Sequence, residues 1–339
     1  MRDLKFICVQ PDDTYYVWQV HLWLESLKKI GHSDKAVVLV FTPNDRILSV
    51  HNWERVVNLY PEAEFVFYKD NHDITQLLRV YVSSLRPYTL WRYFKDNPQR
   101  VADAIFYCDC DILFTEKFNI DSYIEDNVNY LSDTNSYISA SYFDSKVRDV
   151  LPEKLEEYKT RDILAEVTSI VGITRDIAVS NNLDSGGAQY LLKNIDGKFW
   201  TKVMNDCISI RLYLQSINKL FFESEDKGFQ SWCADMWAVL WNLWLREVPV
   251  KVIPEMGFAW APDPIVKLET HPIYHNAGIS GEIMNNYPVF YKGKYHGGKD
   301  PFSDPQLDLV LNHEESKKHC NWLYVKELKE LFNKYHLNY

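Results

Sequence analysis

The sequence predicts an α/β fold, in which a mainly parallel central sheet is flanked by helices and carries an irregular C-terminal elaboration. Three observations support this prediction. Over the first 115 residues, short apolar runs alternate with segments of helical periodicity. The runs are apolar at almost every position, which is typical of parallel strands covered on both faces. Between Glu255 and Pro305 the chain is rich in Gly, Pro, His and Tyr, which indicates a long irregular segment packed over a site.

The first half is expected to alternate strands and helices and to end in a strand. Apolar residues at Val17, Val20, Leu24 and Leu27 share one helical face, and Gly31 ends that helix. The expected elements are a strand over 4–11, a helix over 14–30, a strand over 36–43, a helix over 51–60, a strand over 63–70, a helical region over 74–96 interrupted at Pro87, and a strand over 104–114.

The second half is less regular. It is expected to contain a strand over 137–143, helices over 153–173 and 197–217, and a helix over 230–246 that is apolar nearly all round and therefore buried. The sequence contains no internal repeat and no linker between independent folding units. We therefore expect a single domain over 1–339, divided into parts at 1–115 and 116–305 and a C-terminal helical segment at 306–339.

Composition restricts the class of partner and the compartment. The formal net charge of −10 does not favour a protein that grips nucleic acid, although a small basic face at Lys292, Lys294 and Lys299 keeps that partner possible. No apolar run approaches the ~20 residues that cross a bilayer, and the N-terminus has no signal-peptide layout, so we expect a soluble cytoplasmic protein. The six scattered cysteines indicate reduced, buried thiols.

Two acids interrupt the apolar stretch "AIFYCDCDILF" at Asp109 and Asp111. Ligands gather at the carboxyl ends of strands in an open parallel sheet. On an extended chain, residues two apart point the same way, and two carboxylates so placed raise each other's pKa unless a cation lies between them. Mg²⁺ or Mn²⁺ is the cation that suits such oxygen ligands. The alternative, solvent-facing acids in a turn, is disfavoured because apolar residues flank the pair on both sides.

The segment "FYCDCDILF" resembles the D-x-D segment of nucleotide-sugar-dependent glycosyltransferases with the GT-A (Rossmann-like) fold. Two later segments agree in order: "LDSGGAQYLLKNIDGKFW" resembles the donor-sugar segment of retaining members, and "YHNAGI" resembles a late H-x-x-G motif. The stretches "GFAWAPDP" and "FYKGKYHGGKDPF" are similar to the group of hydroxyproline arabinosyltransferases and serine galactosyltransferases, with their bacterial and viral relatives. The resemblance implies that residues 1–115 bind the nucleotide and 116–305 the donor sugar and acceptor.

The resemblance implies that a histidine completes the metal site and that a lysine soon after it contacts the diphosphate. The family pattern H-x-x-G-x-x-K-P-W is not present intact. His275 and Gly278 supply H-x-x-G without the lysine three residues on, and Lys292 or Lys294 would then contact the diphosphate. His296, Lys299 and Pro301 form a second partial match. His275 is the first choice of ligand because its H-N-A-G setting matches best, and His296 stays open.

Further candidates are weighed against structural roles. Asp184 and Gln189 are expected to bind donor-sugar hydroxyls, while Gly186 and Gly187 let the chain pass beneath the sugar. Asp235 is a candidate for sugar or acceptor binding, with capping of the buried helix as the alternative. The remaining candidates are Gln10 and Tyr15 or Tyr16 for the nucleotide base, and Arg86 and Arg92 for the diphosphate or sugar, with surface salt bridges as the alternative for the arginines.

The implied activity is metal-dependent transfer of a sugar, from a nucleotide-sugar such as a UDP-sugar to an acceptor hydroxyl, with retention of configuration. The acceptor stays open among proteins, glycans, lipids and hydroxymethylated bases of viral DNA. One alternative is a metal-dependent nucleotidyltransferase or nucleotide-sugar hydrolase, but "VQPDDTYY" after the first strand contains no Gly-rich phosphate loop. The other is a non-catalytic protein that binds sugar nucleotides, which the presence of both Asp109 and Asp111 disfavours.

Overall fold

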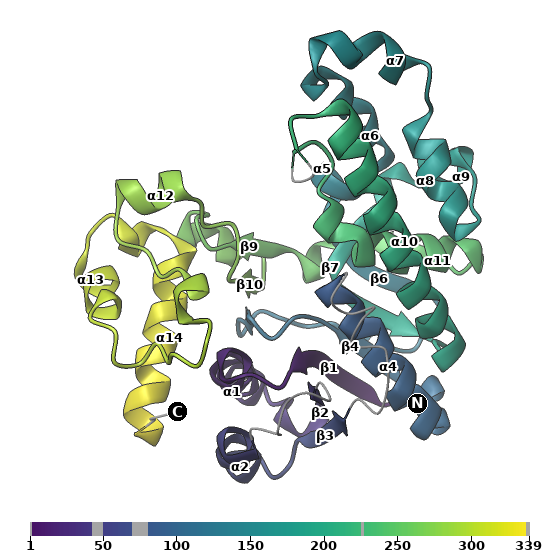
Figure 1. Ribbon diagram of the computed structural model, residues 1–339. Coiled ribbons are helices and arrows are strands. Elements are labelled where there is room, and N and C mark those ends of the chain that lie inside the picture. Colours follow the sequence, from purple (N-terminus) through teal and green to yellow (C-terminus); the bar gives the residue numbers. More distant parts are fainter. Residues whose placement is uncertain (1, 43–49, 70–80, 225–226, 337–339) are drawn as a thin grey trace. The chain divides into compact units, whose positions relative to one another are not determined.

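The computed structural model describes residues 2–42, 50–69, 81–224 and 227–336 (Figure 1). The chain forms two compact units that interleave along the sequence. Unit 1 comprises Met1–Leu4, Asn71–Phe106 and Ser122–Ile253, and unit 2 comprises Lys5–Asp70, Tyr107–Asp121 and Pro254–Tyr339. Within the described residues the larger sheet has seven strands, most of them parallel, so the predicted α/β class is confirmed. The single domain with boundaries at 115 and 305 stays a prediction.

Unit 2 contains the regular α/β half of the chain. Its elements are β1 (Leu4–Pro11), α1 (Thr14–Lys29), β2 (Ala36–Thr42), α2 (Val50–Leu59) and β3 (Glu64–Lys69), in the strand order β3-β2-β1 (Figure 1). All pairs are parallel, with Phe6 opposite Ala36 and Val37 opposite Glu64. Every residue of β2 is buried, which explains why its sequence is apolar without alternation. All five predicted elements are confirmed to within a few residues.

Helix α1 begins and ends where its sequence predicts. The Asp13 carboxylate caps the N-terminus by accepting a hydrogen bond from the Tyr15 amide (2.9 Å). At the other end, Lys28 and Lys29 lie in the last turn, and Gly31 adopts a φ of +77° that favours glycine. The cap at Asp13 therefore sets the point at which the chain turns from β1 into α1.

The segment predicted as one strand over 104–114 is two strands, so this prediction is wrong. Strand β4 (Ala104–Tyr107) belongs to the larger sheet, whereas β5 (Ile112–Phe114) belongs to a second, three-stranded sheet. In that sheet β5 pairs antiparallel with β10 (Ile273–His275), which pairs parallel with β9 (Phe258–Trp260). Residues 108–111 leave one sheet and enter the other, so the two acids lie in a connection and not on a continuous strand.

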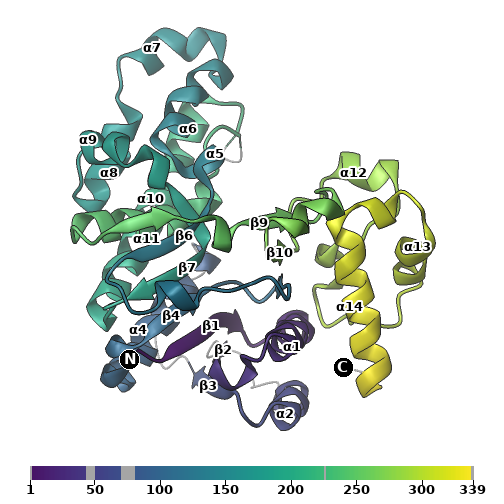
Figure 2. The ribbon, with the colours of Figure 1, turned by 180° about the vertical axis from the view of Figure 1, so that it is seen from behind.

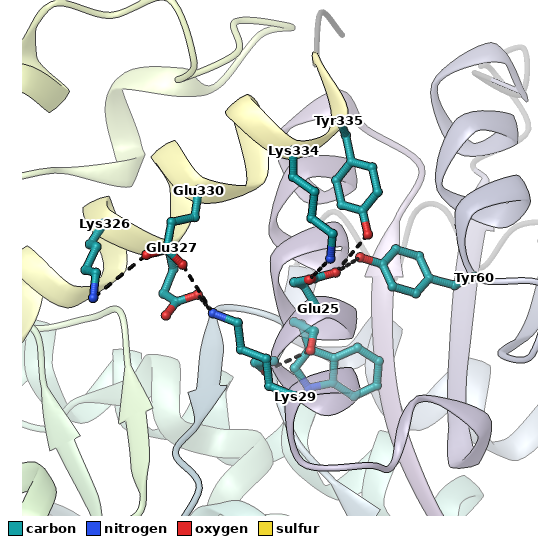
Figure 3. A network of polar contacts seen from close by, with 10 residues as sticks. Glu25, Lys29, Tyr60, Lys326, Glu327, Glu330, Lys334 and Tyr335 are labelled. Carbon is teal, nitrogen blue, oxygen red and sulfur yellow. Dashed lines mark hydrogen bonds and ion pairs between the residues drawn. The ribbon is translucent and has the colours of Figure 1, made fainter.

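The rest of unit 2 covers α1 with aromatic side chains and ion pairs. Helices α12 (Gly281–Asn286), α13 (Gln306–Asn312) and α14 (Cys320–Tyr335) follow the small sheet, and α12 lies in the segment expected to be irregular. Trp18 of α1 packs edge-to-face on the buried rings of Phe290, Tyr295 and Tyr324. Helices α1 and α14 also make polar contacts, and Figure 3 shows Lys334 of α14 paired with Glu25 of α1.

Unit 1 contains four strands of the larger sheet, in the order β4-β7-β6-β8. The added strands are β6 (Asn129–Asp133), β7 (Gly186–Lys193) and β8 (Val250–Val252); β6 runs antiparallel to β7 and parallel to β8. The helices are α4 (Leu85–Asp96), α5 (Asn135–Ile138), α6 (Ala140–Ser145), α7 (Leu155–Lys159), α8 (Ile163–Val171), α9 (Arg175–Ser180), α10 (Gly197–Phe221) and α11 (Ala234–Leu245) (Figure 2). Long helix α10 packs against α4 and α11, and α11 is buried, as predicted for the helix over 230–246.

Three predictions in unit 1 need comment. The expected strand over 137–143 is wrong, because Ser139 ends α5 and its side chain caps α6 by accepting from the Tyr142 amide (3.2 Å). The expected helix over 153–173 is divided, because Asp162 caps a new helix, α8. Pro87 lies in the first turn of α4, which it does not interrupt, while residues 74–80 lie outside the described residues. None of the described helices combines the length and apolar character needed to cross a membrane.

Candidate functional site

Two acids of unit 2 follow β4 directly, and the small sheet brings a histidine to them. Asp109 and Asp111 lie in the connection between β4 and β5. His275 is the last residue of β10 and pairs in register with Ile112 of β5. The Asn276 amide donates to the backbone carbonyl of Asp111 (2.9 Å) and extends this pairing by one bond. Antiparallel pairing of two short strands therefore places His275 beside acids more than 160 residues earlier in the chain.

The three side chains converge. The His275 Nε2 atom lies 3.5 Å from Asp111 Oδ1 and 3.9 Å from Asp109 Oδ2. One ligand atom from each residue lies within 4.8 Å of the other two, and no other group of three His, Cys, Asp or Glu residues in the described parts of the chain does so. Asp111 and His275 are buried, whereas Asp109 is partly exposed. Two of the three side chains are thus buried, and the group is accessible to solvent at Asp109.

This ligand set fits a divalent metal ion. Two carboxylates and an imidazole suit Mn²⁺ or Mg²⁺, which take hard ligands and keep open positions. Two ligands at ~2.1 Å from one ion lie at most about 4.2 Å apart. The distances from His275 to both carboxylates, 3.5 and 3.9 Å, fall within that limit. The identity of the metal stays a prediction, but three of the four predicted ligands are brought together.

The His275 ring is held by two aromatic residues of the neighbouring strand. It stacks on Trp260 (5.1 Å between ring centroids, 28° between planes) and lies against Phe258 (5.7 Å). Both belong to β9, which pairs with β10 so that Trp260 is opposite His275. Sequence reasoning assigned no role to Trp260, since the only signal was its place in "GFAWAPDP". We infer that these rings restrict the orientation of the imidazole.

Lys292 supplies a cation to the same group. Its ammonium donates to Asp111 Oδ2. Burial alone raises the pKa of the Asp111 carboxyl, but the charges of Lys292 and His275 outweigh burial and hold that pKa well below its usual range. Burial likewise lowers the pKa of Lys292, but Asp111 more than compensates, so the pKa of the ammonium is raised. Of the two candidate lysines, Lys292 thus contacts Asp111, whereas Lys294 lines a surface hollow with Lys299 and Asp300; diphosphate binding by any of these lysines stays a prediction.

The second candidate histidine has a different partner. His296 stacks on the ring of Tyr15 (3.9 Å between centroids, 20° between planes) and is not part of the three-residue group. Burial and the nearby Asp111 charge raise the pKa of the Tyr15 hydroxyl, so this ring stays neutral. Gln10 is buried at the end of β1. Gly278 has a φ of +86°, which is a backbone reason for glycine there.

Apart from Tyr16, which lies in α1 of unit 2 beside Tyr15, the remaining predicted residues belong to unit 1, and several have structural partners there. Asp235 pairs with Arg86 (2.6 Å) and accepts from the Tyr81 hydroxyl (2.7 Å), so its buried carboxylate is compensated. The buried Gln189 accepts from the Ser132 hydroxyl (2.6 Å). The Asp184 carboxylate accepts from the Val252 amide (3.2 Å). Their roles in binding sugar stay predictions.

Two glycines and an arginine complete this set. A Cβ at Gly186 would approach the Ser132 carbonyl oxygen to 2.6 Å, so close packing between β6 and β7 already requires glycine there. At Gly187 a Cβ would meet the Met236 methyl (2.7 Å) and the Tyr190 hydroxyl (2.9 Å), the ends of side chains. Arg92 lies in α4. Sugar or diphosphate binding by these three residues also stays a prediction.

Comparisons with known proteins give matches among solved structures. No family model and no curated protein match the sequence. The galactosyltransferase LgtC, in complex with donor and acceptor sugar analogs, matches at a TM-score of 0.44 and 11% identity over 97% of this chain and 99% of its own. The bifunctional glycosyltransferase WbbM matches at 0.41 and 10% identity over 82% of this chain and 46% of its own. Mouse xyloside xylosyltransferase 1 matches at 0.38 and 12% identity over 82% of this chain and all (100%) of its own. All three are named as glycosyltransferases.

Proposed function

We propose that this protein is a metal-dependent glycosyltransferase that moves a sugar from a nucleotide-sugar, with a UDP-sugar as the expected donor, to an acceptor hydroxyl with retention of configuration. The observation that carries the proposal is the convergence of Asp109, Asp111 and His275, with Lys292 on Asp111. Carboxylates that would repel each other are brought together here with an imidazole and an ammonium. Such an arrangement suits a bound cation and the phosphate oxygens that it would hold.

The residues have separate tasks in this proposal. Asp109, Asp111 and His275 would hold the metal, which when bound stabilises the negative charge that grows on the departing diphosphate. Asp109 is the more exposed carboxylate, so the open side of the site lies there. The Lys292 ammonium has three donors and uses one on Asp111, which leaves two for diphosphate oxygens. Trp260 packs on His275 and excludes water from that side of the imidazole.

The turn after β1 argues against a phosphate-loop nucleotide enzyme. Its acids are already used within unit 2: Asp12 accepts from the Trp53 indole (2.9 Å) and the Thr42 hydroxyl (3.1 Å), and Asp13 caps α1. The turn contains no glycine whose backbone amides would cradle phosphates. A glycosyltransferase, which binds phosphate through a metal, fits this turn better than a nucleotidyltransferase that relies on such a loop.

A donor screen tests the proposal. The protein is incubated with single UDP-hexoses and UDP-pentoses, in Mn²⁺ or in EDTA, and the released products are separated. The expected result is release of UDP from a small subset of donors, in Mn²⁺ and not in EDTA, with water as a slow acceptor. Release of UMP would indicate cleavage of the diphosphate and contradict sugar transfer. Equal UDP release in EDTA would contradict the metal site.

A further inference from the structure

Helices α6, α7, α8 and α9 of unit 1 border a hollow that the proposed transfer does not use. Figure 1 and Figure 2 both show these helices gathered at one end of unit 1, away from β4. The hollow has a volume of about 400 Å³, within the range of roughly 300–1,000 Å³ that small-molecule pockets occupy. None of the described residues that line it is a candidate for binding the metal, the nucleotide or the donor sugar. A separate ligand therefore has room to bind there.

The rim of this hollow carries an arginine between two carboxylates. Arg175, the first residue of α9, has its Nη2 atom 3.5 Å from Asp144 Oδ1 and its Nε atom 3.4 Å from Asp162 Oδ2, longer than the ~2.7–2.9 Å of a charge-assisted hydrogen bond. The Arg175, Asp144 and Asp162 side chains are 38%, 62% and 53% exposed, and exposed ion pairs contribute little to stability. The described residues give this guanidinium no other polar contact, so most of its N–H groups are left for a ligand.

The second arginine that lines the hollow differs from Arg175. Arg161 donates from Nε (3.1 Å) and from Nη2 to the two oxygens of Glu166, and Glu166 also accepts from the Tyr213 hydroxyl (2.8 Å). The hydrogen bonds between them raise the pKa of Arg161 and lower the pKa of Glu166. The Arg161 guanidinium is therefore engaged by Glu166, and Arg175 is the arginine of this hollow with most of its donors available.

The buried part of the lining is apolar. Phe143, Ile163 and Leu164 line the hollow and are buried, and the exposed Val147 adds a further apolar side chain. Pockets that combine apolar surface with a few polar groups use the apolar part for contact area and the polar groups for orientation. The hollow thus suits a ligand that has C–H surface on one side and polar groups on the other.

The charges at the rim restrict the class of ligand. An anion that accepted from Arg175 would lie beside Asp144 and Asp162 and be repelled by both, and a cation would be repelled by Arg175. A wholly apolar ligand would remove water from three charged groups without replacing its hydrogen bonds. A neutral hydroxyl both donates and accepts, so neighbouring hydroxyls of one ligand can accept from Arg175 and donate to the two carboxylates. A neutral polyhydroxylated ligand therefore fits this rim best.

We propose that this hollow is a carbohydrate-binding site that takes a neutral saccharide. The ring hydroxyls bind Arg175, Asp144 and Asp162, and the C–H face of the ring covers the apolar part of the lining. This site goes beyond the proposed function, which requires only a donor sugar and an acceptor hydroxyl. Its role in transfer rests on that function: the saccharide is then part of a glycan acceptor, one of the acceptor classes that the sequence leaves open.

A glycan microarray that contains neutral, anionic and cationic glycans tests this site. It is probed with the full chain in EDTA, because EDTA removes any contribution of a metal-dependent site. We expect the wild-type chain to bind a subset of the neutral glycans. The glycan that binds most strongly is then titrated against the wild-type chain and three variants by calorimetry, also in EDTA.

The three variants separate binding in the hollow from binding elsewhere. Arg175→Met keeps an apolar stem without the donors and is expected to weaken binding at least about tenfold, through loss of a charge-assisted hydrogen bond. Val147→Trp places a large ring in the hollow without a change in charge and is expected to abolish binding. Arg148→Met removes a neighbouring exposed arginine that does not line the hollow and is expected to leave binding unchanged.

Three results would overturn the inference: binding to no glycan, binding to charged glycans alone, or unchanged affinity in both Arg175→Met and Val147→Trp. Release of UDP in Mn²⁺, with water as the acceptor, is expected to be the same in these variants as in the wild-type chain. A wild-type chain that releases no UDP but binds neutral glycans would contradict the proposed function and leave the glycan site intact. Thermal unfolding of each variant checks that binding is measured on folded protein.

Discussion

Asp111→Asn is expected to abolish Mn²⁺ binding and to lower sugar transfer at least about a thousandfold, since the metal contributes several kcal/mol of charge stabilisation. Asparagine keeps the size of the side chain and removes the anion that His275 and Lys292 face. The amide oxygen is a weak ligand for a divalent cation next to a lysine. The measurements are Mn²⁺ titration and release of UDP from the donor that the screen identifies.

Two further variants make this result interpretable. Asp121→Asn removes one exposed carboxylate from the same segment of unit 2 and is expected to leave both measurements unchanged. Asp111→Asn leaves the Lys292 ammonium without its partner, which costs stability. The double variant Asp111→Asn with Lys292→Met is therefore expected to recover stability without recovering Mn²⁺ binding. Mn²⁺-dependent turnover that persists in folded Asp111→Asn would contradict the site assignment.

Acidification is expected to destabilise unit 2 through His21, a buried histidine on α1. Its ring lies against Tyr60 (5.4 Å) and Tyr335 (5.1 Å). Burial is the main cause that lowers the pKa of His21 to about 3; the charge of Glu25 opposes this shift, and the charges of Arg55 and Lys334 add to it. In the unfolded chain His21 has an ordinary histidine pKa and binds a proton below pH ~6.5. In the folded chain the same ring binds that proton only near pH 3. Stability is therefore complete above pH ~6.5 and falls as the pH drops toward 3.

The expected loss is roughly 2–3 kcal/mol in the free energy of unfolding between pH 7 and pH 4.5, at 1.36 kcal/mol for each pH unit below the unfolded pKa. Urea unfolding at a series of pH values measures it. His21→Phe keeps an aromatic ring and cannot bind the proton, so its stability should fall less over this range. His313→Phe changes an exposed histidine and should behave like the wild-type chain. Parallel pH profiles for wild type and His21→Phe would refute this account of His21.

The contacts around Glu25 mean that the effect of His21 must be measured above pH ~4.5. Figure 3 shows Glu25 accepting from Tyr60 (2.7 Å) and Tyr335 (3.1 Å) and pairing with Lys334. Burial raises the pKa of Glu25, but these partners lower that pKa by a larger amount, so the net shift is downward. Its contribution to stability is complete above the ordinary pKa of a glutamate and is lost only as the pH falls below it. The window from pH 7 to 4.5 therefore separates the two residues.

The regular half of unit 2 could be predicted because β2 is buried along its whole length and β1 at all but two of its positions. The short apolar runs 4–11 and 36–43 are typical of buried strands, and each is followed by a segment of helical periodicity. This alternation of strands and helices predicts a parallel sheet. The division of 104–114 between β4 and β5 could not be predicted. Both parts are apolar and buried, and only the pairing of β5 with β10, far along the chain, shows that they belong to different sheets.

The residues of the candidate site that lie in a recognisable local sequence pattern could be predicted. The spacing of Asp109 and Asp111 indicated a shared cation, and the H-N-A-G setting favoured His275, which the structure places beside both acids. The choice between Lys292 and Lys294 depended on how the tail folds, and no local pattern distinguishes the two. Trp260 was missed for a similar reason, since its contact with His275 exists only through the β9–β10 pair.

The binding of UDP, with and without Mn²⁺, tests most directly the central claim that a metal at Asp109, Asp111 and His275 holds a nucleotide diphosphate. Titration calorimetry on the wild-type chain needs neither the acceptor nor the donor sugar. We predict that UDP binds in the presence of Mn²⁺ and that EDTA weakens this binding at least about tenfold, since a metal held by these three residues would contact the phosphates. Equal affinity for UDP in Mn²⁺ and in EDTA would contradict the claim.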